Sequence, residues 1–193
     1  MIAAYCWPQS AEPGQTIELF CHTEAHAFQI EVLRQGAENK RVLQQNNIRG
    51  TVQPITDVAE EGCGWNPSCS LQIDPTWPSG LYLIRLTTED GASADAFFVV
   101  RGTEPGDAIL VLSTSTWNAY NTWGGRSFYT GGHVVSPVRP LPPGFLTKID
   151  PYRHRVARFK IWSREDARAF AAEGYDNWSM ASGWANWEIL FAQ

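Results

Sequence analysis

The sequence predicts a mainly β fold: an antiparallel immunoglobulin-like or jelly-roll β-sandwich over residues 1–104, followed over residues 105–193 by the beginning of an α/β domain. Short apolar runs separated by turn residues fill the first part, as they do in β-sandwiches. In the second part a continuous apolar run is followed by segments with helical spacing. The 193 residues are 44% apolar, which is enough to fill a core.

Five segments of the first part have the pattern of β-strands. In the first, Ile17, Leu19 and Cys21 alternate with polar residues, so one face of the strand is expected to be buried. Residues 81–86 are apolar almost throughout, which is typical of a central strand covered on both faces. Asp90-Gly91 provides a hairpin turn before the last strand. The predicted strands are residues 15–23, 27–34, 70–74, 80–89 and 93–101.

Residues 46–69 are predicted to form a long loop with at most a short strand, because Asn, Gly and Pro recur in them. All four cysteines lie in the first part, and Cys63 and Cys69 are spaced to close a small disulfide loop in an oxidising compartment. The N-terminus, however, lacks the basic flank and apolar core of a signal peptide. Reduced thiols and a cytoplasmic location are therefore expected.

Charge is divided unevenly along the chain. Residues 1–104 carry 6 Lys and Arg against 13 Asp and Glu, whereas residues 105–193 carry 9 against 7. Proteins that bind nucleic acid concentrate Lys and Arg on one face, so no nucleic-acid partner is expected. No stretch approaches the roughly 18 apolar residues of a membrane span, so no membrane partner is expected either.

The second part opens with an apolar run, residues 108–112, that is typical of a buried parallel strand. A helix is predicted over residues 164–173, between an N-cap at Ser163 and a stop at Gly174. A last helix is predicted from about Ser182, with Trp and Phe on one face. One strand and an uncovered apolar helix do not complete an α/β sheet. The domain is therefore expected to be truncated and to favour a homo-oligomer or a partner subunit.

The common catalytic signatures G-x-S-x-G, H-E-x-x-H, the Walker loop and the dinucleotide-binding motif do not occur in the sequence. The densest unusual segment, residues 113–129, is rich in Trp, Tyr, Asn and hydroxyl side chains. Such side chains line pockets for small polar molecules, and Gly124 and Gly125 would let the backbone approach a ligand. The alternative is that Trp117 and Trp123 are packing residues and that the glycine pair is only a turn.

Two residues are candidate catalytic groups. Asn121 offers both a hydrogen-bond donor and an acceptor. His133 follows a second glycine pair and could act as an acid or a base, although a lone His is more often a surface or hydrogen-bonded residue. Ser113 and Ser115 have no His or Lys within their segment to activate them, so a serine hydrolase is not predicted.

Several strings of residues resemble the large-subunit family of N,N-dimethylformamidase. W-N-A-Y-N-T-W-G-G-R-S-F-Y over residues 117–129 and S-P-V-R-P-L-P-P-G-F-L over residues 136–146 resemble its site region. W-P-S-G-L-Y over residues 77–82 and F-F-V-V over residues 97–100 resemble the β-sandwich that precedes it. The resemblance implies a glutamine-amidotransferase-like α/β domain after the sandwich. It also implies hydrolysis of the linear C–N bond of a small-molecule amide by metal-activated water.

The resemblance further implies ferric iron held by two tyrosines and a glutamate. Tyrosinate and carboxylate are hard anionic ligands suited to ferric iron, which can polarise an amide carbonyl. By its place in the motif, Tyr120 is the candidate for one ligand, and Tyr129 or Tyr152 for the second. No glutamate clearly corresponds to the third ligand, so the metal site is expected to be incomplete. The alternative to an enzyme is a non-catalytic module that binds a ligand or a partner.

Overall fold

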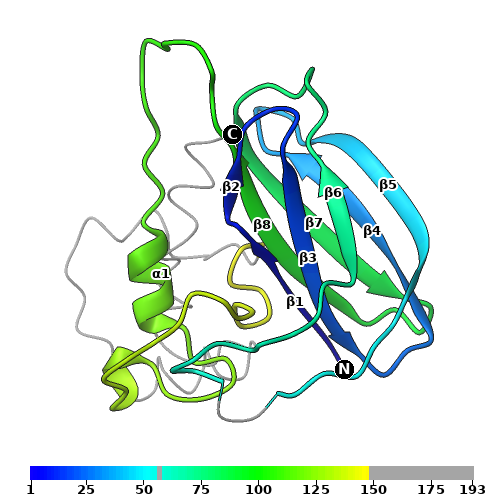
Figure 1. Ribbon diagram of the computed structural model, residues 1–193, viewed down its shortest axis with the longest axis vertical. Coiled ribbons are helices and arrows are strands. Elements are labelled where there is room, and N and C mark those ends of the chain that lie inside the picture. Colours follow the sequence, from blue (N-terminus) through cyan, green and yellow to red (C-terminus); the bar gives the residue numbers. More distant parts are fainter. Residues whose placement is uncertain (56–57, 148–193) are drawn as a thin grey trace.

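The structure is a computed structural model that describes residues 1–55 and 58–147 (Figure 1). The helices predicted over residues 164–173 and from residue 182 lie outside the described residues. The described part is mainly β, and it contains no helix long and apolar enough to cross a membrane. The strands are β1 (Ile2–Trp7), β2 (Ser10–Ala11), β3 (Thr16–Thr23), β4 (Ala27–Arg34), β5 (Lys40–Arg49), β6 (Cys69–Gln72), β7 (Gly80–Thr88) and β8 (Ser93–Val100).

The strands form two sheets packed face to face. One sheet has the strand order β1-β3-β6, and the other has the order β2-β8-β7-β4-β5. Neighbouring strands are antiparallel, except that β2 pairs in parallel with β8. Figure 1 shows the smaller sheet crossing in front of the larger one. The predicted antiparallel β-sandwich is confirmed.

The sandwich core lies between the sheets and follows the predicted alternation. Ile17, Leu19 and Cys21 of β3 are fully buried, and so are Ile30 and Val32 of β4. Burying an aliphatic side chain of this size contributes about 1.5–3 kcal/mol. Because β3 and β4 belong to different sheets, these two rows hold the sheets together.

Strand β7 is covered on both faces, as its continuous apolar run predicts. Tyr82, Ile84 and Leu86 belong to the core between the sheets. Leu81 and Leu83 belong to a second cluster, because successive side chains of a strand point to opposite faces. This outer face of the sheet receives the second part of the chain.

The predicted hairpin joins β7 to β8. The amide of Thr88 donates to the carbonyl of Ala92 across the turn at 2.9 Å, and Gly91 adopts a φ of 84°. The Thr88 hydroxyl donates to the Asp90 carboxylate and lowers the pKa of that carboxyl. Asp90-Gly91 therefore forms the turn that the sequence predicts.

Two predictions about local structure are wrong. Residues 46–49, assigned to a loop, belong to β5, which pairs only with β4 at the edge of its sheet. Lys, Arg, Gln and Asn side chains give β5 no apolar pattern, and polar residues are typical of edge strands. Residues 108–112 form no strand, and Ile109 and Val111 are 88% and 77% exposed. A parallel strand must bond to a neighbour, and no described strand pairs with this run.

The buried thiols predict a loss of stability in alkali. The four cysteines are free, and burial raises the pKa of Cys69 to about 11 and those of Cys21 and Cys63 to about 12, from an ordinary value of 9.0. The folded chain therefore holds these protons more tightly than the unfolded chain does. The contribution of these thiols to the free energy of unfolding is complete below pH 9.0 and is lost as the pH rises from about 9 to about 12. We expect the urea midpoint to fall over this range.

Arg139 changes the stability in the opposite direction as the pH rises, because burial lowers its pKa to about 10 from 12.5. The thiols outnumber it, so the net change is expected to be a loss. Cys63→Ala removes one thiol whose pKa is raised, so the urea midpoint of this variant should fall less steeply with pH. A urea midpoint that stays constant or rises above pH 9 would contradict this account.

Candidate functional site

The second part of the chain packs on the outer face of the five-stranded sheet. Helix α1 (Thr114–Tyr120) buries Trp117, whose side chain is 1% exposed. The Trp117 ring meets Phe97 of β8 edge to face at 5.3 Å between centroids, and it meets Phe145 at 6.2 Å. Such pairs contribute about 0.5–1.5 kcal/mol beyond burial. No side chain caps the start of α1, and the helix is short, so this packing holds it in place.

A second aromatic contact holds the chain after α1. Trp123 lies edge-on to Trp65 of the loop between β5 and β6, at 5.6 Å between ring centroids. Trp65 also contacts Tyr5 of β1, and its indole N–H donates to the carbonyl of Pro54. Trp117 and Trp123 are therefore packing residues. This is what the alternative interpretation of residues 113–129, the aromatic segment, predicts.

Gly124 and Gly125 lie directly against the loop between β5 and β6. Gly124 has a φ of 68° and Gly125 a φ of 150°, conformations that other residues rarely adopt. A Cβ at Gly124 would lie 2.4 Å from Cγ2 of Val58, and one at Gly125 would lie 2.7 Å from Cβ of Ala59. The close approach that glycine permits is thus made to the loop between β5 and β6, here called the sandwich loop.

Gly124→Ala is expected to lower the free energy of unfolding by about 2–5 kcal/mol. The left-handed backbone costs a side chain about 1–2 kcal/mol, and overpacking against Val58 adds about 1–3 kcal/mol. Gly64→Ala is the matched control, because Gly64 has a φ of 59° but nothing within 4 Å of its Cβ position. Urea denaturation of both variants checks the prediction. If Gly124→Ala costs no more than the control, the contact with Val58 is unimportant.

The structure brings two of the three candidate tyrosine ligands together. Tyr120 ends α1, and Tyr129 lies in the 3-10 helix η1 (Phe128–Thr130). Their rings stack with centroids 4.0 Å apart and planes inclined by 14°. Tyr120 is 8% exposed and Tyr129 is 66% exposed, so one phenol lies beneath the other at the surface of the described structure. Tyr152 lies outside the described residues.

Within the tyrosine pair, Tyr120 and Tyr129, the Tyr120 phenol is protonated at neutral pH. Burial, and after it the hydrogen bond and charge of Tyr129, raise the pKa of Tyr120 to about 12. Two neighbouring phenolates would repel each other, whereas a cation beside both oxygens would favour their ionised forms. Among the described residues, no group of three or more His, Cys, Asp or Glu is placed to hold a metal ion.

The two candidate catalytic residues have different surroundings. Asn121 is buried, its side-chain N–H donates to the carbonyl of Pro140 at 2.9 Å, and its side-chain oxygen accepts from the amide of Trp123 at 2.9 Å. Both ends of the Asn121 amide therefore bind the loop itself. His133 is exposed, and its side chain makes no hydrogen bond or ion pair within the described ranges. A catalytic role for either residue stays a prediction.

The sequence reasoning missed a buried arginine, Arg139, which is 2% exposed. Its Nε donates to the carbonyl of Ser136 at 3.0 Å, and its terminal nitrogens donate to the carbonyls of Trp123 at 2.5 Å and Asn121 at 2.9 Å. No carboxylate of the described residues pairs with it. The S-P-V-R-P string contains this residue, but nothing in its composition indicates burial.

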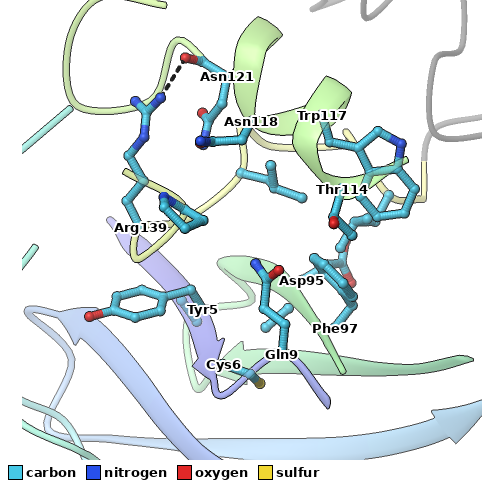
Figure 2. Close-up of a pocket in the computed structure, with 15 residues that line it drawn as sticks. Tyr5, Cys6, Gln9, Asp95, Phe97, Thr114, Trp117, Asn118, Asn121 and Arg139 are labelled. Atoms are coloured by element: carbon cyan, nitrogen blue, oxygen red, sulfur yellow. Dashed lines mark hydrogen bonds between the residues drawn. The ribbon is translucent and has the colours of Figure 1, made fainter. Parts of the chain in front are cut away.

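A cavity of about 20 Å³ lies between the sandwich and α1 (Figure 2). Figure 2 shows Tyr5 and Asp95 on the sandwich side and Asn118 and Arg139 on the opposite side. A space of this size holds about one water molecule. Nε1 of Trp117 and Oδ1 of Asn118, both on residues that line it, have no hydrogen-bond partner in the described structure. The cavity suits a structural water and is too small for an amide substrate.

A larger open hollow, of about 460 Å³, lies beside residues 141–147 where they pass β1 and β8. Arg85 and Asp95 line it and form an ion pair at 3.4 Å. The hydroxyl of Thr147 donates to the same carboxylate at 2.8 Å. The tyrosine pair lines neither this hollow nor the smaller cavity, so the pair is a separate feature of the surface.

The fold and the site define a β-sandwich protein with an aromatic segment built onto its outer face. The chain belongs to the N,N-dimethylformamidase beta subunit-like family, whose C-terminal model matches residues 29–179, and this confirms the resemblance seen in the sequence. A search of curated proteins gives no match. Among solved structures, the chain is similar to murine CEACAM1b, with 13% identity and a TM-score of 0.29. That match covers 54% of this chain and 55% of the other, so the chain spans about half the length of that relative.

Proposed function

We propose that the protein takes part in hydrolysing the linear C–N bond of a small amide, with ferric iron held by Tyr120 and Tyr129. The observation that carries the proposal is the face-to-face tyrosine pair. Two residues named as candidates from the motif meet within 4.0 Å between ring centroids. Membership of the dimethylformamidase-like family supports the choice of an amide as substrate.

The tyrosine pair fits ferric iron by the chemistry of its donors. Phenolate oxygen is a hard anionic ligand, and a trivalent cation would offset the repulsion between two neighbouring phenolates. Because the pKa of Tyr120 is raised to about 12, binding must displace a tightly held proton. Iron affinity is therefore expected to rise with pH. Ferric iron supplies a Lewis acid that polarises an amide carbonyl toward attack by water.

The residues of the chain have distinct roles in this proposal. Tyr120 is the rigid ligand, because it is buried at the end of α1. Tyr129 is the outer ligand and leaves one side open to solvent. The sandwich supplies a fixed platform through Trp117 and Trp123 and takes no part in the chemistry. A carboxylate ligand is expected from outside the described residues.

Elemental analysis of the purified chain, together with an assay of N,N-dimethylformamide hydrolysis, tests the proposal. We expect iron to copurify with the chain or to be taken up from added ferric salt, and dimethylamine and formate to appear in proportion to iron. Chelation should remove the activity, and ferric iron should restore it. A chain that takes up no iron and releases no dimethylamine at any iron concentration would refute the proposal.

The second candidate function is a binding module without catalysis. Its support is the exposed aromatic pair Phe128 and Tyr129, which are 49% and 66% exposed beside the buried ring of Tyr120. Tyr120→Phe separates the two functions, because it keeps the ring and removes only the hydroxyl. Loss of iron with this substitution favours the enzyme, whereas retention of amide binding without iron favours the module.

A further inference from the structure

The tyrosine loop, residues 121–138, contains Tyr129 and has little regular structure, so something else must fix its shape. It leaves α1 at Asn121, crosses the sandwich loop at Gly124, and returns to the sandwich loop at Ser136. The return is anchored by two main-chain bonds, from Ser136 to the carbonyl of Ala59 at 2.7 Å and from Cys63 to the carbonyl of Val138 at 2.9 Å. Residues 136–138, where the loop returns, lie beside residues 121–123, where it leaves α1, and one side chain joins the two segments.

That side chain is Arg139. All three nitrogens of its guanidinium donate to main-chain carbonyls, those of Asn121 and Trp123 near the exit and that of Ser136 in the return. The three carbonyls therefore share one planar group, whose five N–H donors have a fixed geometry. Figure 2 shows the guanidinium and Asn121 facing each other above the cavity, with their hydrogen bond dashed.

The arrangement is costly for a residue that only fills space. A charged group buried without a carboxylate partner loses its hydration, and an apolar side chain of similar size often serves at least as well in such a place. What an apolar side chain cannot do is hold three carbonyls in one plane. The chemistry of the position therefore indicates that the shape of the loop is the property that needs the guanidinium.

We propose that Arg139 is the positioning residue of the tyrosine pair: its guanidinium fixes the loop in the shape that stacks Tyr129 on Tyr120. Its guanidinium bonds to main-chain carbonyls and acts through the loop. The consequence for iron rests on the function proposed above, whereas the consequence for the stacking does not. Loss of positioning contacts around metal ligands typically lowers metal affinity about 10-fold to 100-fold.

The test is a nuclear Overhauser measurement between tyrosine rings in the full chain. In the wild type we expect a cross-peak between Tyr120 and Tyr129, and an internal control from the stacked pair Trp77 and Tyr82 at 5.4 Å in the sandwich. Arg139→Met should abolish the first cross-peak and keep the second. Arg101→Met is the matched control, because the Arg101 side chain bonds, among the described residues, to Ser10 and Glu12 of the sandwich, and this variant should keep both cross-peaks.

A milder variant covers the case in which Arg139→Met does not fold. Arg139→Lys keeps the charge, but a single ammonium cannot hold all three carbonyls. It should therefore weaken the Tyr120–Tyr129 cross-peak while the Trp77–Tyr82 cross-peak remains. An unchanged Tyr120–Tyr129 cross-peak in a folded Arg139 variant would overturn the proposal.

Ferric titration of the same variants provides the second readout, followed by phenolate-to-iron absorption in the visible range. We expect affinity to fall about 10-fold to 100-fold in Arg139→Met and to be unchanged in Arg101→Met. Equal affinity despite a lost ring contact would contradict the proposed iron site, because the stacked geometry would then be unnecessary for binding, and would still support the role of Arg139 in the stacking. If the wild type binds no ferric iron, the proposed function fails, and the ring cross-peaks still decide the role of Arg139.

Discussion

Trp117→Ala is expected to lower the free energy of unfolding by about 3–5 kcal/mol, the range found for large aromatic side chains removed from a core. Trp117 is 1% exposed and joins α1 to Phe97 of the sheet and to Phe145 beyond the tyrosine loop. Removing it opens a cavity at the junction of three segments. The helix has no capping side chain to hold it without this ring. Urea denaturation monitored by circular dichroism measures the change.

The matched control for Trp117→Ala is Phe128→Ala. Phe128 is also a large aromatic side chain of the same segment, but it is 49% exposed. Substitutions at such surface positions usually change stability by about 0.5 kcal/mol or less. If Trp117→Ala proves as mild as the control, α1 is not anchored to the sandwich through this ring. The description of a docked aromatic segment would then be incorrect.

Tyr120→Phe is expected to lower the affinity for ferric iron at least about tenfold, which corresponds to about 1.4 kcal/mol. The substitution removes the buried phenolic oxygen and keeps the ring that stacks on Tyr129. Fold and stacking should therefore persist while one ligand is lost. Ferric titration should show a weaker phenolate-to-iron absorption band. In the wild type, affinity should rise with pH because binding displaces the proton of Tyr120.

Tyr82→Phe is the control for this substitution. Its hydroxyl donates to the carbonyl of Pro78 inside the sandwich, remote from the tyrosine pair. The control removes a buried phenolic hydroxyl as Tyr120→Phe does, and it should bind ferric iron as the wild type does. Equal iron binding by the wild type and by Tyr120→Phe would exclude Tyr120 as a ligand. A parallel loss in Tyr82→Phe would mean that the effect is one of stability.

The strands with an apolar pattern could be predicted from the sequence, because one buried face imposes a period of two residues. The alternation in β3 and β4 and the continuous run in β7 appear in the structure where the sequence placed them. Strand β5 could not be found in this way, since its only partner among the described strands is β4 and its side chains are mostly polar. Strand β1 was not identified, although its side chains are mostly buried.

Much of the composition of the aromatic segment, residues 113–129, serves packing. Trp117, Trp123 and the glycine pair are used against the sandwich, and their long-range partners Phe97, Trp65 and Val58 are not visible in local sequence. A helix such as α1, with little intrinsic propensity, depends on tertiary contacts that no sequence window contains. The run at residues 108–112 shows the reverse case, in which an apolar pattern is present but no described strand pairs with it.

For the candidate site, the motif named Tyr120 as one ligand and left Tyr129 and Tyr152 open for the second, and the structure shows how Tyr120 and Tyr129 lie. The stacking of Tyr120 on Tyr129 depends on the fold of the intervening loop, which spacing alone does not specify. Arg139 was missed for the same reason, because its three acceptors are main-chain carbonyls and leave no trace in residue type.

The central claim is that Tyr120 and Tyr129 together form a ferric iron site. Diffraction from crystals of the iron-loaded protein, recorded on both sides of the iron absorption edge, tests it most directly. We expect one anomalous peak within bonding distance of the phenolic oxygens of both tyrosines, and no such peak in crystals of Tyr120→Phe. An iron peak remote from both oxygens, or the same peak in Tyr120→Phe crystals, would contradict the claim.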